Sequence, residues 1–466
     1  MFGATSPQRS LIRVFPGTTV CCPRQGVSTQ RRIFVSRRPR RVVVNPVMLR
    51  RCAMQVEYER CCGIDVHKET VVACVIGPGA EGKPVKVTRT FSTLTGELKA
   101  LAQWLTEQAV THVAMESTGV YWKPVYNVLE GQFELLVVNA EHLKKLRGRK
   151  TDVADAEWIA DLLRHGLLKG SFIPSAQQRA WRDLTRYRTT LTDERSREVN
   201  RVQKVLEDAN IKLASVASNV VGVSGRAMLE QLIQGTTDPA TLAELAKGRL
   251  REKRDLLEQA LTGTFQAHHR FMLIQHLSHI DFLDEQIAKL DAELEEQMRP
   301  FQAALTRWDQ IPGINLRIAQ VILAEVGTDL KQFEDAAHLA SWAGMCPGNH
   351  ESGGKRHSGR TRQGSRWLRR ALVEAAHGAA RTKDKYFKNL YHRLAGRRGK
   401  KRAIVAVGHS LLVTGYYLIT RGQDYEDLGA NYFDERNQEM VKRQAVKRLE
   451  KLGFQVELKL AVPAPA

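Results

Sequence analysis

Short hydrophobic runs separated by turn-forming stretches begin near residue 61. The runs are rich in β-branched residues, and Gly77-Pro78-Gly79 separates the second from the third. Three consecutive runs of this kind predict three strands in an antiparallel meander. The predicted strands are Cys61–Asp65, Thr70–Ile76 and Val85–Phe91.

Helical and strand patterns then alternate as far as residue 165. Apolar residues at helical spacing predict helices over Leu94–Gln108, Tyr121–Leu129 and Thr151–His165. Strands are expected at His112–Met115 and Glu134–Val138. The resulting order, β-β-β-α-β-α-β-α in about 110 residues, is that of the RNase H-like fold, an α/β architecture.

The middle of the chain has a heptad period instead. Apolar residues follow intervals of three and four in two seams, which are Val199, Val202, Leu206, Ala209 and Leu213, and Ile280, Leu283, Ile287, Leu290 and Leu294. These seams predict two long helices that pair as a coiled-coil linker, with a small helical insertion over Gly222–Gly263. The same pattern is expected for three arrangements: two helices that pair within one chain, helices that pair between protomers, and an ordinary helical bundle.

A third pattern starts near residue 308. The turn Ile311–Ile314 precedes a helix that ends at Gly327, as in a helix-hairpin-helix-like element. Such a turn either presents backbone N–H groups to a phosphate or only caps the helix. A Gly/Ser/Arg-rich loop, Cys346–Ser365, and a helix over Arg366–Ala380 follow, so we expect a mainly helical C-terminal domain.

These patterns divide the chain into five parts. They are a basic, disordered N-terminal extension (1–57), an RNase H-like domain (58–175), a helical linker (176–300), a C-terminal domain (301–425) and a tail (426–466). The extension is compatible with a transit peptide or a nucleic-acid-binding arm. We favour a third interpretation, upstream sequence translated from an early start, with Met48 or Met54 as the natural initiator.

The distribution of charge along the chain indicates a binding partner. The chain has 71 Lys+Arg and 50 Asp+Glu, for a net charge of +21. Residues 1–56 hold 11 arginines and no acidic residue, and residues 355–402 hold 17 basic and 2 acidic residues. Two concentrated basic zones on an otherwise balanced chain indicate a nucleic-acid partner, although a solvated basic face gives the same composition.

The same composition points to a cytoplasmic protein. No stretch approaches the ~18–20 uncharged apolar residues that span a bilayer, so we expect no membrane segment. The seven cysteines form no C-x-x-C pair, and no secretory hydrophobic segment is found. Reduced thiols in the cytosol are therefore expected.

Four carboxylates fall at the same end of the predicted sheet. Asp65 lies on the first strand and Glu116 ends the fourth, while Asp152 and Asp155 lie one turn apart at the start of the last helix. Converging carboxylates need a cation, and oxygen ligands favour Mg²⁺, with Mn²⁺ as the alternative. Such ions support phosphodiester chemistry. The plain alternatives are a helix cap for Asp152 and a surface charge for Glu116.

A serine lies within the basic loop. Ser352 is followed by small residues and by Lys355, Arg356, Arg360 and Arg362, which can neutralise phosphates. The serine either donates a hydrogen bond to a phosphate or acts as a nucleophile that holds a cleaved DNA end. Further nucleic-acid contacts are expected at Lys150, Arg366, Arg369 and Arg370.

Together these segments resemble the insertion-sequence 110 family of transposases. Gly63–Lys68, Met115–Gly119 and Lys150–Ala156 are similar to the family's three DEDD motifs. Residues from Ile311 to Arg370 are similar to its transposase domain. The resemblance covers residues 61 to 425 and departs at Glu351, where the family often has a second serine.

The resemblance implies an RNA-guided DNA recombinase with a Holliday-junction-resolvase-like N-terminal domain. It implies that Asp65, Glu116, Asp152 and Asp155 hold Mg²⁺ and that Ser352 forms a phosphoserine with DNA, with Ser358 as the fallback nucleophile. The implied partners are element and target DNA and a structured guide RNA from the element. We also expect a dimer or tetramer, associated with the nucleoid.

Three other functions fit parts of the sequence. A metal-dependent nuclease or junction resolvase would use the same carboxylates with water as nucleophile. The fold of sugar-kinase- or actin-like ATPases also begins with a strand that contains Gly-Ile-Asp. Such an ATPase needs Gly-rich phosphate-binding loops on later strands, and the sequence shows none. A non-catalytic nucleic-acid scaffold leaves the four carboxylates unexplained. The sequence favours the recombinase, and the paired seams suggest that acids and serine meet across protomers.

Overall fold

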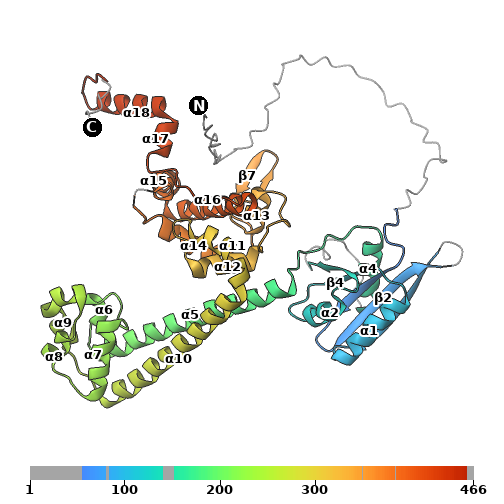
Figure 1. Cartoon of the computed structure of the whole chain (residues 1–466), viewed down its shortest axis with the longest axis horizontal. Coiled ribbons are helices and arrows are strands. Elements are labelled where there is room, and N and C mark those ends of the chain that lie inside the picture. Colours follow the sequence, from blue (N-terminus) through green and yellow to red (C-terminus); the bar gives the residue numbers. More distant parts are fainter. Residues whose placement is uncertain (1–54, 80–82, 140–151, 349, 384, 459–466) are drawn as a thin grey trace, which may run out of the picture. The chain divides into compact units, whose positions relative to one another are not determined.

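The computed structural model describes residues 55–79, 83–139, 152–348, 350–383 and 385–458. These residues belong to two compact units, 55–173 and 174–458 (Figure 1). Nearly all of the predicted N-terminal extension lies outside the described residues, and so does Lys150.

The N-terminal unit contains one five-stranded sheet and three described helices. Its elements are β1 (Cys61–Val66), β2 (Thr70–Pro78), β3 (Pro84–Ser92), α1 (Thr95–Glu107), β4 (His112–Glu116), α2 (Trp122–Leu129), β5 (Glu134–Val138) and α4 (Asp152–Arg164). The strand order is β3-β2-β1-β4-β5. β1, β2 and β3 pair antiparallel, whereas β4 is parallel to β1 and to β5. The predicted meander and the predicted element order are both confirmed.

The central strand β1 is buried on both faces. On one face, Cys62 and Ile64 share a core with Leu101 of α1. On the other face, Cys61 packs with Ala160 of α4. Two covered faces explain why the segment reads as an apolar run without alternation. Burial raises the pKa of the Cys61 thiol to about 12, as expected of a core cysteine.

The second unit begins with two long helices, α5 (Ala176–Asp208) and α10 (Ala267–Met298), which pack along each other. Contacts between them run in opposite directions along the two sequences, from Arg188–Asp291 to Glu198–His276 and then Asp208–His269. The pairing is therefore antiparallel and lies within one chain. This agrees with one of the interpretations that the heptad seams left open. Because the seams are buried within the chain, they do not by themselves support an active site shared between protomers.

One detail of the first seam was wrong. The sequence predicted a single helix through Leu213, but α5 ends at Asp208 and Leu213 begins the short helix α6 (Leu213–Val216). Asn210, with φ of 57°, turns the chain between them. The apolar spacing continues because the core itself continues around this turn.

The predicted insertion is helical. It consists of α7 (Val223–Gln234), α8 (Pro239–Glu244), η3 (Gly248–Lys253) and α9 (Arg254–Leu261), and the short helix α6 precedes it. Leu229 and Leu257 from the insertion share a core with Leu206 of α5 and Leu273 of α10. The insertion is thus packed on the far ends of the two long helices.

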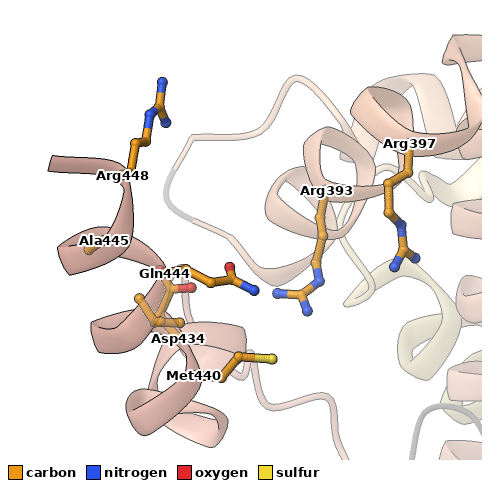
Figure 2. A pocket seen from close by; sticks show the side chains of 8 residues that line it. Arg393, Arg397, Asp434, Met440, Gln444, Ala445 and Arg448 are labelled. Atoms are coloured by element: carbon orange, nitrogen blue, oxygen red, sulfur yellow. The ribbon is translucent and has the colours of Figure 1, made fainter. Parts of the chain in front are cut away.

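The rest of the unit is mainly helical, as predicted. Its elements are η4 (Arg299–Phe301), α11 (Gln302–Asp309), α12 (Leu316–Val326), α13 (Ala336–Trp342), β6 (His350–Ser352), β7 (Lys355–Ser358), α14 (Arg366–Ala379), α15 (Tyr386–Arg398), α16 (Lys400–Arg421), α17 (Tyr432–Arg436) and α18 (Gln438–Lys451). Trp308, Ile322, Leu372 and Leu411 lie in one shared core. α18 faces α15 across a pocket (Figure 2).

The turn before α12 packs against a neighbouring helix. Gly313 has φ of 88°, and a Cβ there would lie 2.2 Å from the carbonyl oxygen of Ala375 in α14. The Asn315 side chain accepts a hydrogen bond of 2.9 Å from the backbone N–H of Ile318. These contacts match the capping alternative rather than a phosphate-binding turn.

Two expectations need correction. The segment predicted as a loop, Cys346–Ser365, contains the two-stranded hairpin β6–β7. The polar residues at this hairpin give no alternating hydrophobic pattern from which strands could be predicted. In addition, α16 is one helix that is long and apolar enough to cross a membrane by length and composition, although no such segment was expected. Half of that stretch is buried inside the unit, as in a core helix.

Candidate active site

Asp65 of β1 and Glu116 of β4 occupy neighbouring positions on adjacent strands. The two strands are parallel, and Ile64 pairs with Met115, so the next residues along each strand are Asp65 and Glu116. Ala114, two residues before Glu116, packs on the α4 face of the sheet. Because strand side chains alternate, Glu116 belongs to the same face as Ala114.

Gly63 sets how closely α4 crosses this face. A Cβ on Gly63 would lie 2.3 Å from the carbonyl oxygen of Ala156 and 2.3 Å from the N atom of Ala160. The missing side chain therefore lets the α4 backbone rest directly on β1. Asp65 is two residues further along β1, on the same face, and Asp155 directly precedes Ala156.

The acid cluster, defined as Asp65, Glu116, Asp152 and Asp155, thus comes from three neighbouring elements. Asp65 is 6% exposed, whereas Glu116 and Asp155 are half-buried. Asp152 is the first residue of α4, but its side chain lies outside the described part. The carboxylate of Asp65 is also 3.1 Å from Nε2 of His67, a contact that sequence analysis did not single out.

The donor chemistry of the acid cluster fits a hard divalent cation. All its members offer carboxylate oxygens, the ligand type that Mg²⁺ and Mn²⁺ prefer. The residues that are present therefore suit a metal ion of this class.

A second group of possible ligands has a simpler explanation. Asp208, His268 and His269 have potential ligand atoms within 4.8 Å of one another. However, Nε2 of His269 is 2.9 Å from Asp208, and its Nδ1 accepts a hydrogen bond from the N–H of Gln266. Both ring nitrogens are thus used at the start of α10, and the hydrogen bond from His269 lowers the pKa of Asp208.

Ser352 ends the first strand of the hairpin, next to a two-residue turn. Gly353 and Gly354 have φ of 57° and 74°, the pair of positive values that a type I′ turn requires. Ser352 pairs with Lys355 across the turn. A Cβ on either glycine would meet nothing within 4 Å, so the tip of the hairpin is open. The Ser352 side chain itself lies outside the described part of the structure.

The base of the hairpin is closely packed. The N–H of Gly348 donates a 2.7 Å hydrogen bond to the carbonyl of Arg360. A Cβ on Gly364 would lie 2.5 Å from the backbone N of Gly344. The backbone of Ser352 therefore lies at the open tip of a short hairpin whose base is held by close packing.

The predicted basic residues fall into two groups. Lys355, Arg360, Arg362 and Arg366 are exposed, and Arg366 lies over the ring of Trp367 at 4.5 Å. The position of Arg356 on β7 is known, but its side chain is among those that the structure does not describe.

The other group already has protein partners. Arg369 donates to the carbonyl of Gly344 at 2.9 Å and to the hydroxyl of Thr361 at 2.7 Å, so it holds the hairpin base. Arg370 forms a bidentate pair with Asp193 of α5. The hydrogen bond from Arg370 lowers the pKa of Asp193. A nucleic-acid role for these two arginines remains a prediction.

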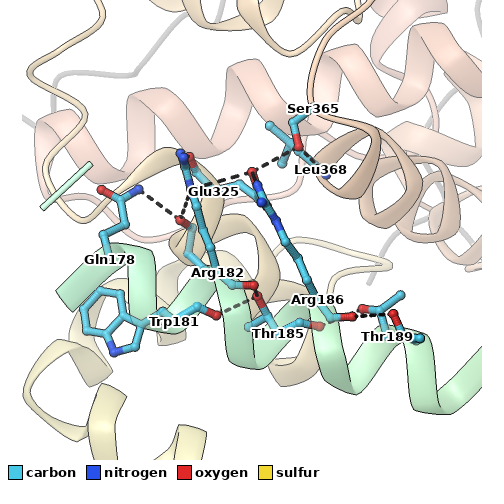
Figure 3. A network of polar contacts seen from close by, with 11 residues as sticks. Gln178, Trp181, Arg182, Thr185, Arg186, Thr189, Glu325, Ser365 and Leu368 are labelled. Carbon is cyan, nitrogen blue, oxygen red and sulfur yellow. Dashed lines mark hydrogen bonds and ion pairs between the residues drawn. The ribbon is translucent and has the colours of Figure 1, made fainter. Parts of the chain in front are cut away.

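A buried carboxylate connects the linker to the hairpin, and sequence analysis missed it. Glu325 of α12 is 1% exposed and accepts two hydrogen bonds from Arg186 of α5, at 2.8 and 3.1 Å. The hydroxyl of Ser365 donates to the same carboxylate at 3.0 Å. Ser365 also caps α14, at the end of the segment that leads from β7 to that helix (Figure 3).

Arg182 completes this network. Its guanidinium donates to the carbonyl of Ala324 at 3.0 Å and to the carbonyl of Glu325. Burial lowers the pKa of Arg182, and the charge of Glu325 opposes that effect. The available signal was a lone glutamate in an apolar helix, together with two arginines one turn apart on α5.

Comparison with known proteins identifies the family. A transposase model of the DEDD type matches residues 62–211, and the model described as "Transposase IS116/IS110/IS902 family" matches residues 306–392. The chain belongs to the IS110 family of transposases. It is therefore a DNA transposase, as the sequence motifs predicted, and this DEDD type of enzyme indicates dependence on a divalent metal ion.

Relatives of this IS110-family chain carry matching names. A probable family 20 transposase of Pseudomonas aeruginosa is 26% identical over 272 residues, which is 58% of this chain and 71% of the relative. The transposase for insertion sequence element IS1111A of Coxiella burnetii is 24% identical over 294 residues, covering 62% and 72% of the two chains.

Two further proteins are similar to only about a quarter of this chain each. A pilin gene-inverting protein of Moraxella bovis is 31% identical over 119 residues, which is 25% of this chain and 37% of the relative. Among solved structures, Thermus thermophilus RuvC is similar over 24% of this chain and 99% of its own, with 15% identity and a TM-score of 0.20.

Proposed function

We propose that this transposase cuts and rejoins DNA with two sets of groups, the acid cluster and Ser352. The observation that carries the proposal is the placement of Asp65 and Glu116 side by side, on the sheet face that α4 crosses at Gly63. The acid cluster would hold Mg²⁺, with Mn²⁺ as a substitute. When bound, the metal supplies charge neutralisation at the scissile phosphate.

The serine step conserves the phosphodiester bond energy. The Ser352 hydroxyl oxygen bonds to phosphorus, and the bond from phosphorus to one adjoining sugar oxygen breaks. The serine gives up one proton, and the departing sugar oxygen gains one, so the step needs no further reactant. A sugar hydroxyl of another strand then attacks the phosphoserine and releases the serine.

The exposed basic side chains around the hairpin support this role. Lys355 lies opposite Ser352 in the hairpin, while Arg360 and Arg362 follow on the second arm. Cations at these positions would neutralise phosphates beside the attacked one. The relative named for inverting a pilin gene also favours recombination, because an inverted segment must be both cut and rejoined.

The finer partners belong to the same proposal. A structured RNA from the element would guide the choice of donor and target DNA, and the protein would act as a dimer or tetramer in the cytoplasm, at the nucleoid. If acid cluster and serine come from different protomers, a mixture of Ser352→Ala and Asp65→Asn proteins should regain activity. A mixture no more active than either variant alone contradicts the shared site.

A trapping experiment tests the proposed function. Full-length protein is mixed with the element's flanking non-coding RNA, Mg²⁺ and labelled element-junction DNA, then separated on a denaturing gel. We expect a protein–DNA adduct that Ser352→Ala abolishes and Ser358→Ala retains. DNA cleavage without any adduct would instead indicate a nuclease or junction resolvase that uses water.

A further inference from the structure

An arginine-lined pocket lies at the C-terminal end of the described chain. It has a volume of about 540 Å³ and lies between α15 on one side and α17 and α18 on the other. Arg393 and Arg397 come from α15, whereas Gln444 and Arg448 come from α18. Figure 2 shows Arg393, Arg397 and Gln444 extending into the space between the helices.

Within the part of the chain that the structure describes, the three arginines of this pocket lack the carboxylate partners that arginines of the linker, such as Arg195 and Arg226, have. Among the described residues, Arg393, Arg397 and Arg448 have no carboxylate oxygen within 4.0 Å, although Asp434 is part of the lining. Arg393 instead lies over the ring of Phe433 at 5.2 Å, which holds its guanidinium in place. Three arginines and one carboxylate line the pocket, so its lining has an excess of positive charge. The Arg393 and Arg397 side chains extend into the space, whereas the Arg448 side chain points away from them (Figure 2).

The surroundings add to that excess. Residues 385–402 contain eight basic residues and no acidic one, and α18 contains five basic and two acidic residues. The side chains of Arg398, Lys400 and Lys401, just beyond the pocket, are exposed. Like charges brought together in this way repel one another, and a polyanion relieves the repulsion.

We propose that this pocket binds the sugar-phosphate backbone of a nucleic acid. The guanidiniums suit phosphate oxygens, which accept paired hydrogen bonds from arginine. Met440 provides an apolar wall against which a sugar can pack, and Gln444 provides an amide. All these residues follow residue 392, where the family match ends, so the site goes beyond the proposed catalytic groups.

Paired variants test the site without depending on the serine chemistry. The test variant is Arg393→Gln with Arg397→Gln. The control is Arg195→Gln with Arg226→Gln, which removes the same charge from arginines that are paired with Asp284 and Asp281. Arg397→Lys keeps the charge, and Arg397→Gln alone leaves the stacking of Arg393 intact. Thermal melting confirms that each protein is folded.

The readout is the salt dependence of binding. Affinities of the full-length proteins for duplex DNA and for single-stranded RNA, both of arbitrary sequence, are measured by fluorescence anisotropy over a series of salt concentrations. Losing two phosphate contacts should lower the slope of log affinity against log salt by about 1.8 for the duplex or about 1.4 for the single strand.

The two probes separate the possible sources of the backbone. A change with DNA alone assigns the pocket to DNA, a change with RNA alone assigns it to RNA, and a change with both supports a shared site. The control and Arg397→Lys should keep the slope of the unaltered protein. Unchanged slopes for the test variant with both probes, or an equal change in the control, would overturn the proposal.

Discussion

The acid cluster and the Ser352 hairpin are held in place by different physical means. In the first, Gly63 is needed for packing, because a Cβ would lie 2.3 Å from the backbone of α4. In the second, Gly353 and Gly354 are needed for their positive φ angles, and a Cβ on either would meet nothing within 4 Å. One site is built inside a fold, and the other stands at the tip of a turn.

This difference is consistent with the two roles that we propose for the acid cluster and for Ser352. Metal ligands must hold their geometry closely, and a site on packed strands and a helix achieves that. A nucleophile that first bonds to DNA and then releases it benefits from an open position. We therefore expect a glycine substitution in the packed site to lower the stability of the fold more than a glycine substitution at the turn.

After the loss of the adduct in Ser352→Ala, the largest effect is expected from Asp65→Asn. Loss of one ligand should remove several kcal/mol of transition-state stabilisation, which is roughly a 10³-fold slower cleavage. Single-turnover cleavage rates measure it. The control is Glu157→Gln, a carboxylate on α4 that pairs with Lys86 outside the cluster. Equal losses in both variants would contradict a special role for Asp65.

Comparison of Gly63→Ala with Gly353→Ala tests the division itself. The first should destabilise the N-terminal unit by roughly 3 kcal/mol through overpacking. The second should cost only about 1 kcal/mol, through backbone strain. Denaturant unfolding followed by circular dichroism measures both.

Gly96→Ala is the control for this pair, because a Cβ at Gly96 in α1 meets nothing within 4 Å. It should leave stability unchanged or slightly raised. If Gly353→Ala costs more than Gly63→Ala, the contrast between packed site and open turn is wrong.

A smaller effect is expected from Glu325→Gln. This change leaves Arg186 without its charged partner and should cost about 2–3 kcal/mol, less than for a fully buried pair because Arg186 is partly exposed. Since Ser365 anchors the arm that carries Ser352, adduct formation should also slow. Parallel measurements of unfolding and adduct rate, with Arg226→Gln as a surface-pair control, check this.

The smallest effect concerns acid stability of the linker. Burial opposes ionisation of Glu198, but the hydrogen bond from His276 and the nearby charges of Arg201, His279 and His276 outweigh it, so the pKa of Glu198 is lowered. A carboxylate with a lowered folded pKa stabilises the fold above its unfolded pKa, near 4.5, and loses that contribution as pH falls further.

Unfolding experiments between pH 7 and pH 3 test this point. Relative to Glu198→Gln, the unaltered protein should lose about 1 kcal/mol of stability as pH falls below about 4.5. Identical pH profiles for the two proteins would show that Glu198 does not contribute in this way.

Much of the sheet, and the placement of Asp65 and Glu116 on neighbouring strands, could be predicted from sequence, because local patterns determine them. β-branched runs marked the strands, and strand ends marked Asp65 and Glu116. The hairpin was not predicted, because the residues that flank Gly353-Gly354 are polar and show no alternating hydrophobic pattern, so this turn-forming pair was assigned to a loop. Glu325 was missed because its partner Arg186 is 139 residues away in sequence.

The division into a packed acid cluster and an open serine arm is tested most directly by finding the residue that bonds to DNA. The trapped adduct of the full-length protein would be digested with protease and nuclease and analysed by mass spectrometry. We predict a nucleotide remnant on Ser352. A remnant on Ser358 or on any other residue, or cleaved DNA with no remnant on the protein, would contradict the account.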